Sequence, residues 1–89
     1  MAFVILLHQK AAKELEKLEE IQRSRIKERL RELQNNPESI GKPLKPSDFW
    51  SLRIGDYRAI FEIDRAKKQV IVLFIGHRKK VYDDFSKLL

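Results

Sequence analysis

Two arginines are placed to meet across a predicted β-hairpin, and their pairing is the clearest indication of chemistry in the sequence. Gly55-Asp56 is a two-residue hairpin signal between two stretches of alternating apolar and polar residues. If these two residues form the turn, Arg53 lies directly opposite Arg58. Like charges in that position repel, at a cost of a few tenths to about 1 kcal/mol. Stability alone does not explain such a pair, whereas two rigidly held guanidinium groups suit the binding of a phosphate.

The rest of the hairpin separates into two faces. One face is apolar and predicts a core; its residues are Trp50, Leu52, Ile54, Tyr57, Ala59 and Phe61. The other face holds the two arginines together with Ser51, Ile60 and Glu62. Two interpretations of the pair therefore stay open: Glu62 or another acid neutralises it, or it binds an anion.

A second basic cluster follows the last predicted strand, in the run from Gly76 to Tyr82. Basic residues with one aromatic ring suit contacts to backbone phosphates and a stacked base. Two lysines of a proline-containing loop extend the cationic surface. The predicted RNA-binding residues are Lys42, Lys45, His77, Lys79 and Lys80.

The distribution of charge favours a polyanionic partner. The net charge is +6, and residues 42–80 carry 10 basic and 4 acidic side chains, against 8 and 7 in residues 1–41. Charge concentrated on one part of a chain is typical of proteins that bind nucleic acid or an acidic protein segment. A basic domain whose charge serves only solubility is the alternative.

Composition excludes several classes of site and location. The chain has no cysteine, which rules out disulfides, zinc–cysteine sites and thiol nucleophiles. With His8 and His77 far apart in sequence, a histidine metal site is not expected, and no cofactor is indicated. No apolar run reaches the roughly 18 residues needed to span a membrane. The N-terminal run lacks the marks of a signal peptide, so we expect a cytoplasmic protein with a single domain over residues 1–89.

Hydrophobic periodicity predicts an α+β fold. Residues 3–7 form a β-favouring apolar run, expected to be a buried strand, and residues 9–19 and 21–35 show the stripes of a two-helix hairpin. Residues 36–48 contain all three prolines of the chain, which predicts a loop. Strands over 50–54, 57–63 and 70–75 predict a three-stranded antiparallel meander, with Gly76 ending the last strand. A short C-terminal helix or an extended tail completes the chain.

The whole chain resembles the RelE/ParE toxin superfamily. The resemblance rests on the run Trp50–Asp64, the strand 70–75 and the segment from Gly76 to Tyr82. Its His-Arg-x-x-Val-Tyr ending is more similar to the RNA-cleaving RelE branch than to the gyrase-poisoning ParE branch. The resemblance implies a microbial-RNase-like fold, cleavage of mRNA in the ribosomal A site, and inhibition by a co-expressed, RelB-like antitoxin. It assigns the family's catalytic positions to Arg53, Arg58, Arg78 and Tyr82.

Two departures from the family are visible. Some members have a lysine where this chain has Ser51, and the interval from Arg78 to Tyr82 is shorter here than in some members. Both departures concern the strength and the ribosome dependence of the activity that the resemblance implies.

A metal-independent mechanism fits the residues as a hypothesis. The RNA 2′-hydroxyl attacks the adjacent phosphate, which gives a 2′,3′-cyclic phosphate and a free 5′-hydroxyl. Fixed guanidinium groups would stabilise the charge of the transition state, a role assigned to Arg58 first and Arg53 second. Tyr82 is the candidate base, because neighbouring cations such as Arg78 favour the phenolate. Tyr82 stacking on a base is the alternative, and His77 is a second candidate proton carrier, unless it is a strand-end residue without chemistry.

Two other functions remain open at the level of sequence. One is a ParE-like, non-enzymatic toxin that binds DNA gyrase. The other is a basic RNA-binding module without activity.

Overall fold

The molecule combines a mixed β-sheet with helices on both of its faces. The structure is a computed structural model that describes residues 2–87, apart from the side chains of residues 82, 84 and 85. In chain order the elements are β1 (Val4–Leu7), α1 (Gln9–Glu16), α2 (Glu20–Arg31), the 3-10 turn η1 (Glu32–Gln34), α3 (Pro37–Ile40), β2 (Lys42–Pro43), β3 (Trp50–Ile54), β4 (Tyr57–Asp64), β5 (Gln69–His77) and α4 (Arg78–Ser86).

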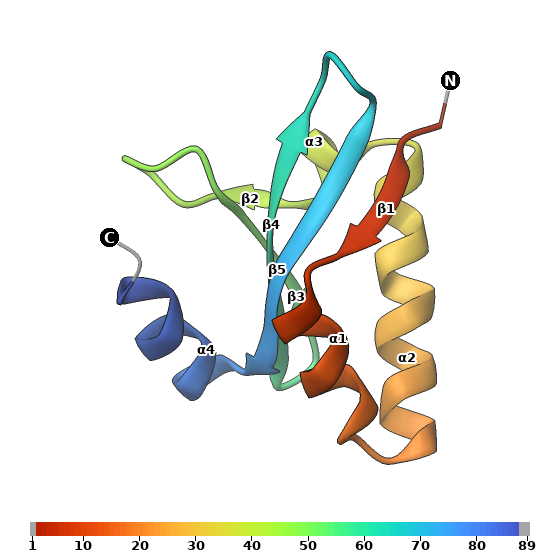
Figure 1. Cartoon of the computed structure of the whole chain (residues 1–89), viewed down its shortest axis with the longest axis vertical. Coiled ribbons are helices and arrows are strands. Elements are labelled where there is room, and N and C mark those ends of the chain that lie inside the picture. The colour runs from red at the N-terminus through yellow and green to blue at the C-terminus, as the bar shows by residue number, and fades with distance from the viewer. Residues whose placement is uncertain (1, 88–89) are drawn as a thin grey trace.

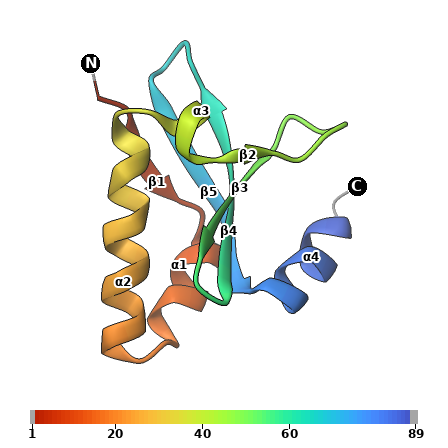
Figure 2. The same cartoon turned by 180° about the vertical axis from the view of Figure 1, so that it is seen from behind.

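The sheet has five strands in the order β1-β5-β4-β3-β2. The strands β3, β4 and β5 form the predicted antiparallel meander, while β1 pairs with β5 in parallel and β2 extends the opposite edge. Helices α1 and α2 lie together on one side of the sheet (Figure 1). Helix α4 lies on the other side, next to the loop that joins β2 to β3, as the view from behind also shows (Figure 2). The α+β prediction is therefore confirmed.

The side of the sheet under α1 and α2 is called the helix face, and it holds the main core. Its side chains on β3 and β4 include the six that the hairpin pattern predicted, of which Trp50 and Tyr57 are only partly buried, and Ile63 of β4 joins them. The predicted stripes of α1 and α2 pack against them, with Ala11 and Ile26 at 0% exposure, and β5 adds Val70, Val72 and Ile75. The helix hairpin was thus placed correctly from the spacing of its apolar residues.

The β3–β4 hairpin has the register that its turn residues predicted. Gly55 has a φ of 61°, a left-handed conformation that glycine adopts without the steric cost of a Cβ. Arg53 pairs with Arg58 and Ile54 with Tyr57. The two arginines therefore lie directly opposite each other, on the side of the sheet away from α1 and α2.

A bulge in the β4–β5 ladder changes which side chains share a face. Ile60 pairs with Phe74 but Phe61 pairs with Val72, so Leu73 is the extra residue on β5. Both Leu73 and Phe74 pack into a second, smaller core with Ile60. After the bulge, Arg58 pairs with Gly76 rather than with a bulkier residue. The sequence pattern did not predict this irregularity.

The prediction of a buried first strand was wrong. β1 is an edge strand, and Val4, Leu6 and Leu7 are 56%, 40% and 38% exposed. As an edge strand of the described sheet, β1 pairs with β5 alone. In the described part of this segment, Phe3 and Ile5 are the residues that pack against the main core. An apolar composition predicted the strand correctly but gave no information about what covers it.

The segment 36–48 is more regular than the predicted loop. It contains α3 and the short β2, in which Lys42 pairs with Ser51. Gly41 joins these two elements beneath the main core, where an added Cβ would lie 2.5 Å from Cζ of Phe61. The last strand, predicted over 70–75 and ended by Gly76, is also longer than predicted, because β5 spans Gln69–His77. In the described part of the chain, no helix has the length and apolar character that crossing a membrane requires.

Candidate nucleic-acid interface

The side of the sheet away from α1 and α2 is called the arginine face, after Arg53 and Arg58. Arg53 is exposed and Arg58 is half-buried. The Nε of Arg53 donates a hydrogen bond to the Gly55 carbonyl (3.4 Å), and the Arg53 carbonyl accepts one from Nε of Arg29 (3.5 Å). These contacts hold the hairpin that presents both guanidinium groups.

A third cation joins this face from β2. Lys42 pairs with Ser51, and directly paired residues of an antiparallel ladder project to the same side. Ser51 is two residues from Arg53 on β3, so it also projects to the arginine face. Lys42 is exposed, whereas Ser51 is only 4% exposed. Lys42 is thus part of the arginine face and not merely of a projecting loop.

Helix α4 packs on the arginine face, which brings the second basic cluster to the first. Val81 is 2% exposed and packs with Ile60 and Phe74. Gly76, the partner of Arg58, lies next to Val81, since a Cβ built at Gly76 would be in ordinary van der Waals contact with the Cβ of Val81, at 3.7 Å. The helix therefore begins beside the hairpin.

A backbone hydrogen bond ties the start of α4 to the hairpin. The amide of Arg78 donates to the carbonyl of Asp56 in the hairpin turn, over 2.9 Å. Arg78, Lys79 and Lys80 are all exposed. Tyr82 falls within α4, but its side chain lies outside the described residues, so its place in the site stays a prediction.

His77 is separated from the arginine pair. It pairs with Tyr57, a residue of the helix face, and the two rings meet edge to face with centroids 6.0 Å apart. Its Nδ1 accepts a hydrogen bond from the amide of Lys79 at the start of α4 (3.4 Å). In the neutral ring, this leaves the proton on Nε2.

Glu62 does not neutralise the arginine pair. It is half-buried on the arginine face, and it forms no ion pair with any residue that the structure describes. Among the described residues there is also no group of three or more His, Cys, Asp or Glu side chains that could hold a metal ion.

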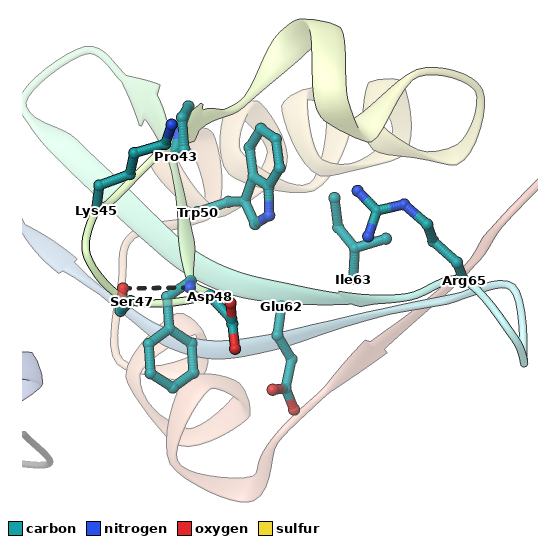
Figure 3. Close-up of a pocket in the computed structure, with 9 residues that line it drawn as sticks. Pro43, Lys45, Ser47, Asp48, Trp50, Glu62, Ile63 and Arg65 are labelled. Carbon is teal, nitrogen blue, oxygen red and sulfur yellow. Dashed lines mark hydrogen bonds between the residues drawn. The ribbon is translucent and has the colours of Figure 1, made fainter.

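Lys45 lies apart from the arginines, at a pocket of about 460 Å³ beside the β2–β3 loop. Figure 3 shows Lys45 and Arg65 at opposite ends of this pocket, with Trp50 between them. Nε of Arg65 donates to Oε1 of Glu38 over 2.9 Å. This hydrogen bond from Arg65, aided by its positive charge, lowers the pKa of Glu38, and the same contact raises the pKa of Arg65.

Sequence reasoning missed a second pocket, of about 410 Å³, on the arginine face. Its lining residues are His8, Lys10, Phe49, Glu62, Leu73 and Phe74. Only Glu62 could have been placed there from the strand period, since it follows Arg58 and Ile60 at intervals of two. The contribution of Leu73 beside Phe74 depends on the bulge, and that of His8 depends on how β1 leads into α1.

Solved structures of small toxins share this fold. The chain is 27% identical to a RelBE2 toxin–antitoxin complex from Mycobacterium tuberculosis, with a TM-score of 0.82 over 88% of this chain and 93% of that one. It is also 27% identical to a free mutant of the Escherichia coli toxin RelE, with a TM-score of 0.78 over 100% and 99% of the two chains. An archaeal RelE–RelB complex from Pyrococcus horikoshii is 25% identical, with a TM-score of 0.71 over 88% and 97%.

Sequence comparisons agree with the structural ones. The toxin RelE of Mycobacterium tuberculosis is 38% identical over 52 residues, which are 56% of this chain and 54% of that protein, so the match spans about half of the curated relative. A family model described as the ParE toxin of the type II toxin–antitoxin system parDE matches residues 5–82. The chain belongs to the RelE/ParE superfamily of type II toxin–antitoxin toxins.

Proposed function

We propose that the protein is an antitoxin-controlled endoribonuclease that cuts mRNA, with the scissile phosphate bound on the arginine face. The observation behind this proposal is the pairing of Arg53 with Arg58, with Lys42 projecting to the same side opposite Ser51, two residues along β3 from Arg53. Helix α4 adds Arg78 beside this group. A cationic face of this kind attracts the phosphate backbone of RNA.

The arginines would act on the charge that develops at phosphorus. The RNA 2′-oxygen forms a bond to the phosphorus while the bond to the 5′-oxygen breaks, and the products are a 2′,3′-cyclic phosphate and a free 5′-hydroxyl. Guanidinium groups held by a sheet are oriented before the reaction, so they stabilise the transition state without reorganising. Arg58 has the larger role because it is half-buried, where charge–charge interactions are less screened than at exposed Arg53.

A base must take the proton of the 2′-hydroxyl and an acid must supply one to the leaving 5′-oxygen. Tyr82 remains the candidate for the base, since it follows Arg78 by one turn of α4, the helix that packs on the arginine face. The register of His77 with Tyr57 favours a structural role for His77 at the start of α4. The ribosomal A site would supply the alignment of the RNA that a shallow face does not.

A RelB-like antitoxin is the proposed protein partner. Several of the solved structures of relatives are toxin–antitoxin complexes. This chain leaves apolar side chains of β1 exposed, and a hollow of about 190 Å³ between β1 and α2 is lined in part by Ile5, Leu7 and Leu30. Exposed apolar surface on a sheet edge is suited to covering by a partner's chain.

Primer-extension mapping of mRNA cuts, with and without ribosomes and in the presence of EDTA, tests the nuclease. We expect the wild-type protein to cut mRNA and Arg58→Ala to cut it about 100-fold more slowly, which is the typical cost of losing one donor to the transition state. Arg31→Ala is the matched control, because Arg31 is an exposed arginine of α2, on the other side of the sheet. Tyr82→Phe is expected to lose cleavage as well.

Two outcomes would replace this proposal. The family model is described by the name ParE, so a protein that cuts no mRNA but blocks DNA supercoiling by gyrase is a gyrase-binding toxin. A protein that does neither, and only retards RNA in a salt-dependent way, is a binding module.

A further inference from the structure

The pocket lined by Glu62 has the composition of a nucleobase site. Its apolar walls come from Phe49, Leu73 and Phe74. Phe74 is 7% exposed and belongs to the small core with Val81, so this wall is held in place. RNA-binding proteins that recognise sequence commonly stack an unpaired base against aromatic side chains and bond to its edges. The volume of about 410 Å³ is within the roughly 300–1,000 Å³ range of small-molecule sites.

The polar groups of the pocket fall into one acceptor and two donors. Among the described lining residues Glu62 is the one carboxylate, and it forms no ion pair with another described residue. An ionised carboxylate only accepts hydrogen bonds. The ammonium of Lys10 lies over the Phe74 ring, 4.8 Å from its centroid. Nδ1 of His8 accepts from the amide of Lys10 (3.2 Å), so the neutral ring has its remaining donor at Nε2.

Guanine is the base that complements this set. Its N1–H and N2–H₂ groups are adjacent donors that a carboxylate accepts together, and its O6 and N7 atoms are acceptors. Adenine and cytosine place a ring nitrogen acceptor beside the amino group, which a carboxylate repels. Uracil offers a single N–H between two carbonyl oxygens.

The pocket is within reach of an RNA strand bound at the arginines. Glu62 follows Arg58 by four residues on the same face of β4, which is about 13 Å along the strand at roughly 3.3 Å per residue. We propose that the pocket formed by Phe49, Glu62 and Phe74 binds a guanine of the RNA near the scissile phosphate, which gives the protein a base preference of its own. This inference rests on the proposed RNA substrate.

Binding of uncleavable RNA tests the pocket separately from the nuclease. The probes are fluorescent 2′-O-methyl tetranucleotides, UGUU and UAUU, which lack the nucleophile. We expect the wild-type full chain to bind UGUU about tenfold more tightly than UAUU, in line with one bidentate base contact. Glu62→Gln, which keeps the shape of the side chain, is expected to remove most of that preference and leave UAUU binding unchanged. Glu28→Gln on α2 is the matched control for loss of one carboxylate at an exposed site.

Amide chemical shifts on titration with UGUU locate the site, and we expect changes at Glu62 and Leu73. A preference for UGUU that survives in Glu62→Gln overturns the proposal, as does binding without shifts at these residues. Protection of the same amides by an antitoxin but not by UGUU also overturns it, in favour of a protein occupant. If the protein cuts no mRNA but keeps the Glu62-dependent preference for UGUU, the guanine pocket is supported and the nuclease proposal fails. If the protein cuts mRNA without a base preference, and Glu62→Gln cuts it in the same way, the nuclease proposal is supported and the guanine pocket fails.

Discussion

The two faces of the sheet use the same strands for different purposes. On the helix face, Leu52, Ala59 and Phe61 lie at or near full burial beneath α1 and α2. On the arginine face, the buried cluster among the described side chains is the small one of Ile60, Phe74 and Val81, and charged residues and pockets surround it. One face therefore provides most of the folding free energy, while the other can place like charges side by side at the modest cost of their repulsion.

Consecutive residues of β4 allow the faces to be compared directly. Phe61 and Ile60 are both 0% exposed but point to opposite sides. We expect Phe61→Ala to lower the free energy of unfolding by about 3–5 kcal/mol, from lost burial and the cavity that remains. Ile60→Ala is expected to cost less, because the cluster around it is smaller. Urea denaturation of the two variants measures the difference, and equal costs would contradict the assignment of most stability to the helix face.

The difference between the faces also explains what the sequence could predict. The register of Arg53 with Arg58 follows from a two-residue turn, and the helix face follows from strict alternation on both strands. The pocket at Glu62 depends on the bulge that turns Leu73 and Phe74 to the same side. Bulges and the exposure of β1 are decided by tertiary packing, which local periodicity does not encode.

A substitution in the small core sharpens the comparison. Val81→Ala removes two methyl groups from a residue that is 2% exposed, which costs about 2 kcal/mol when the cavity is included. We expect the effect to be concentrated on α4, because Val81 is the residue by which this helix enters the small core with Ile60 and Phe74. Amide hydrogen exchange should accelerate in α4 and stay slow in α2, and mRNA cleavage should fall several-fold as Arg78 loses its position.

Asp83→Ala is the control for Val81→Ala, since Asp83 is an exposed residue of the same helix. Uniform acceleration of exchange in α2 and α4 would mean that the two faces unfold together and that the small core is not a separate unit.

The smallest expected effect comes from the ion pair at the rim of the Lys45 pocket. Glu38 of α3 and Arg65 of the β4–β5 turn are both exposed, and such pairs are screened by water and salt.

The hydrogen bond from Arg65 lowers the pKa of Glu38 from its ordinary value of 4.5. The folded protein therefore binds this proton less tightly than the unfolded chain, so the contribution of the pair is present above pH 4.5 and is lost as the pH falls through the lowered pKa. We expect the Tm of Glu38→Gln to lie slightly below that of the wild type at pH 7 in low salt, and to match it once Glu38 is protonated or at high salt. Neither residue of this ion pair belongs to the buried core of either face. A Tm change as large as that of Val81→Ala would therefore show that stability is not confined to those two cores.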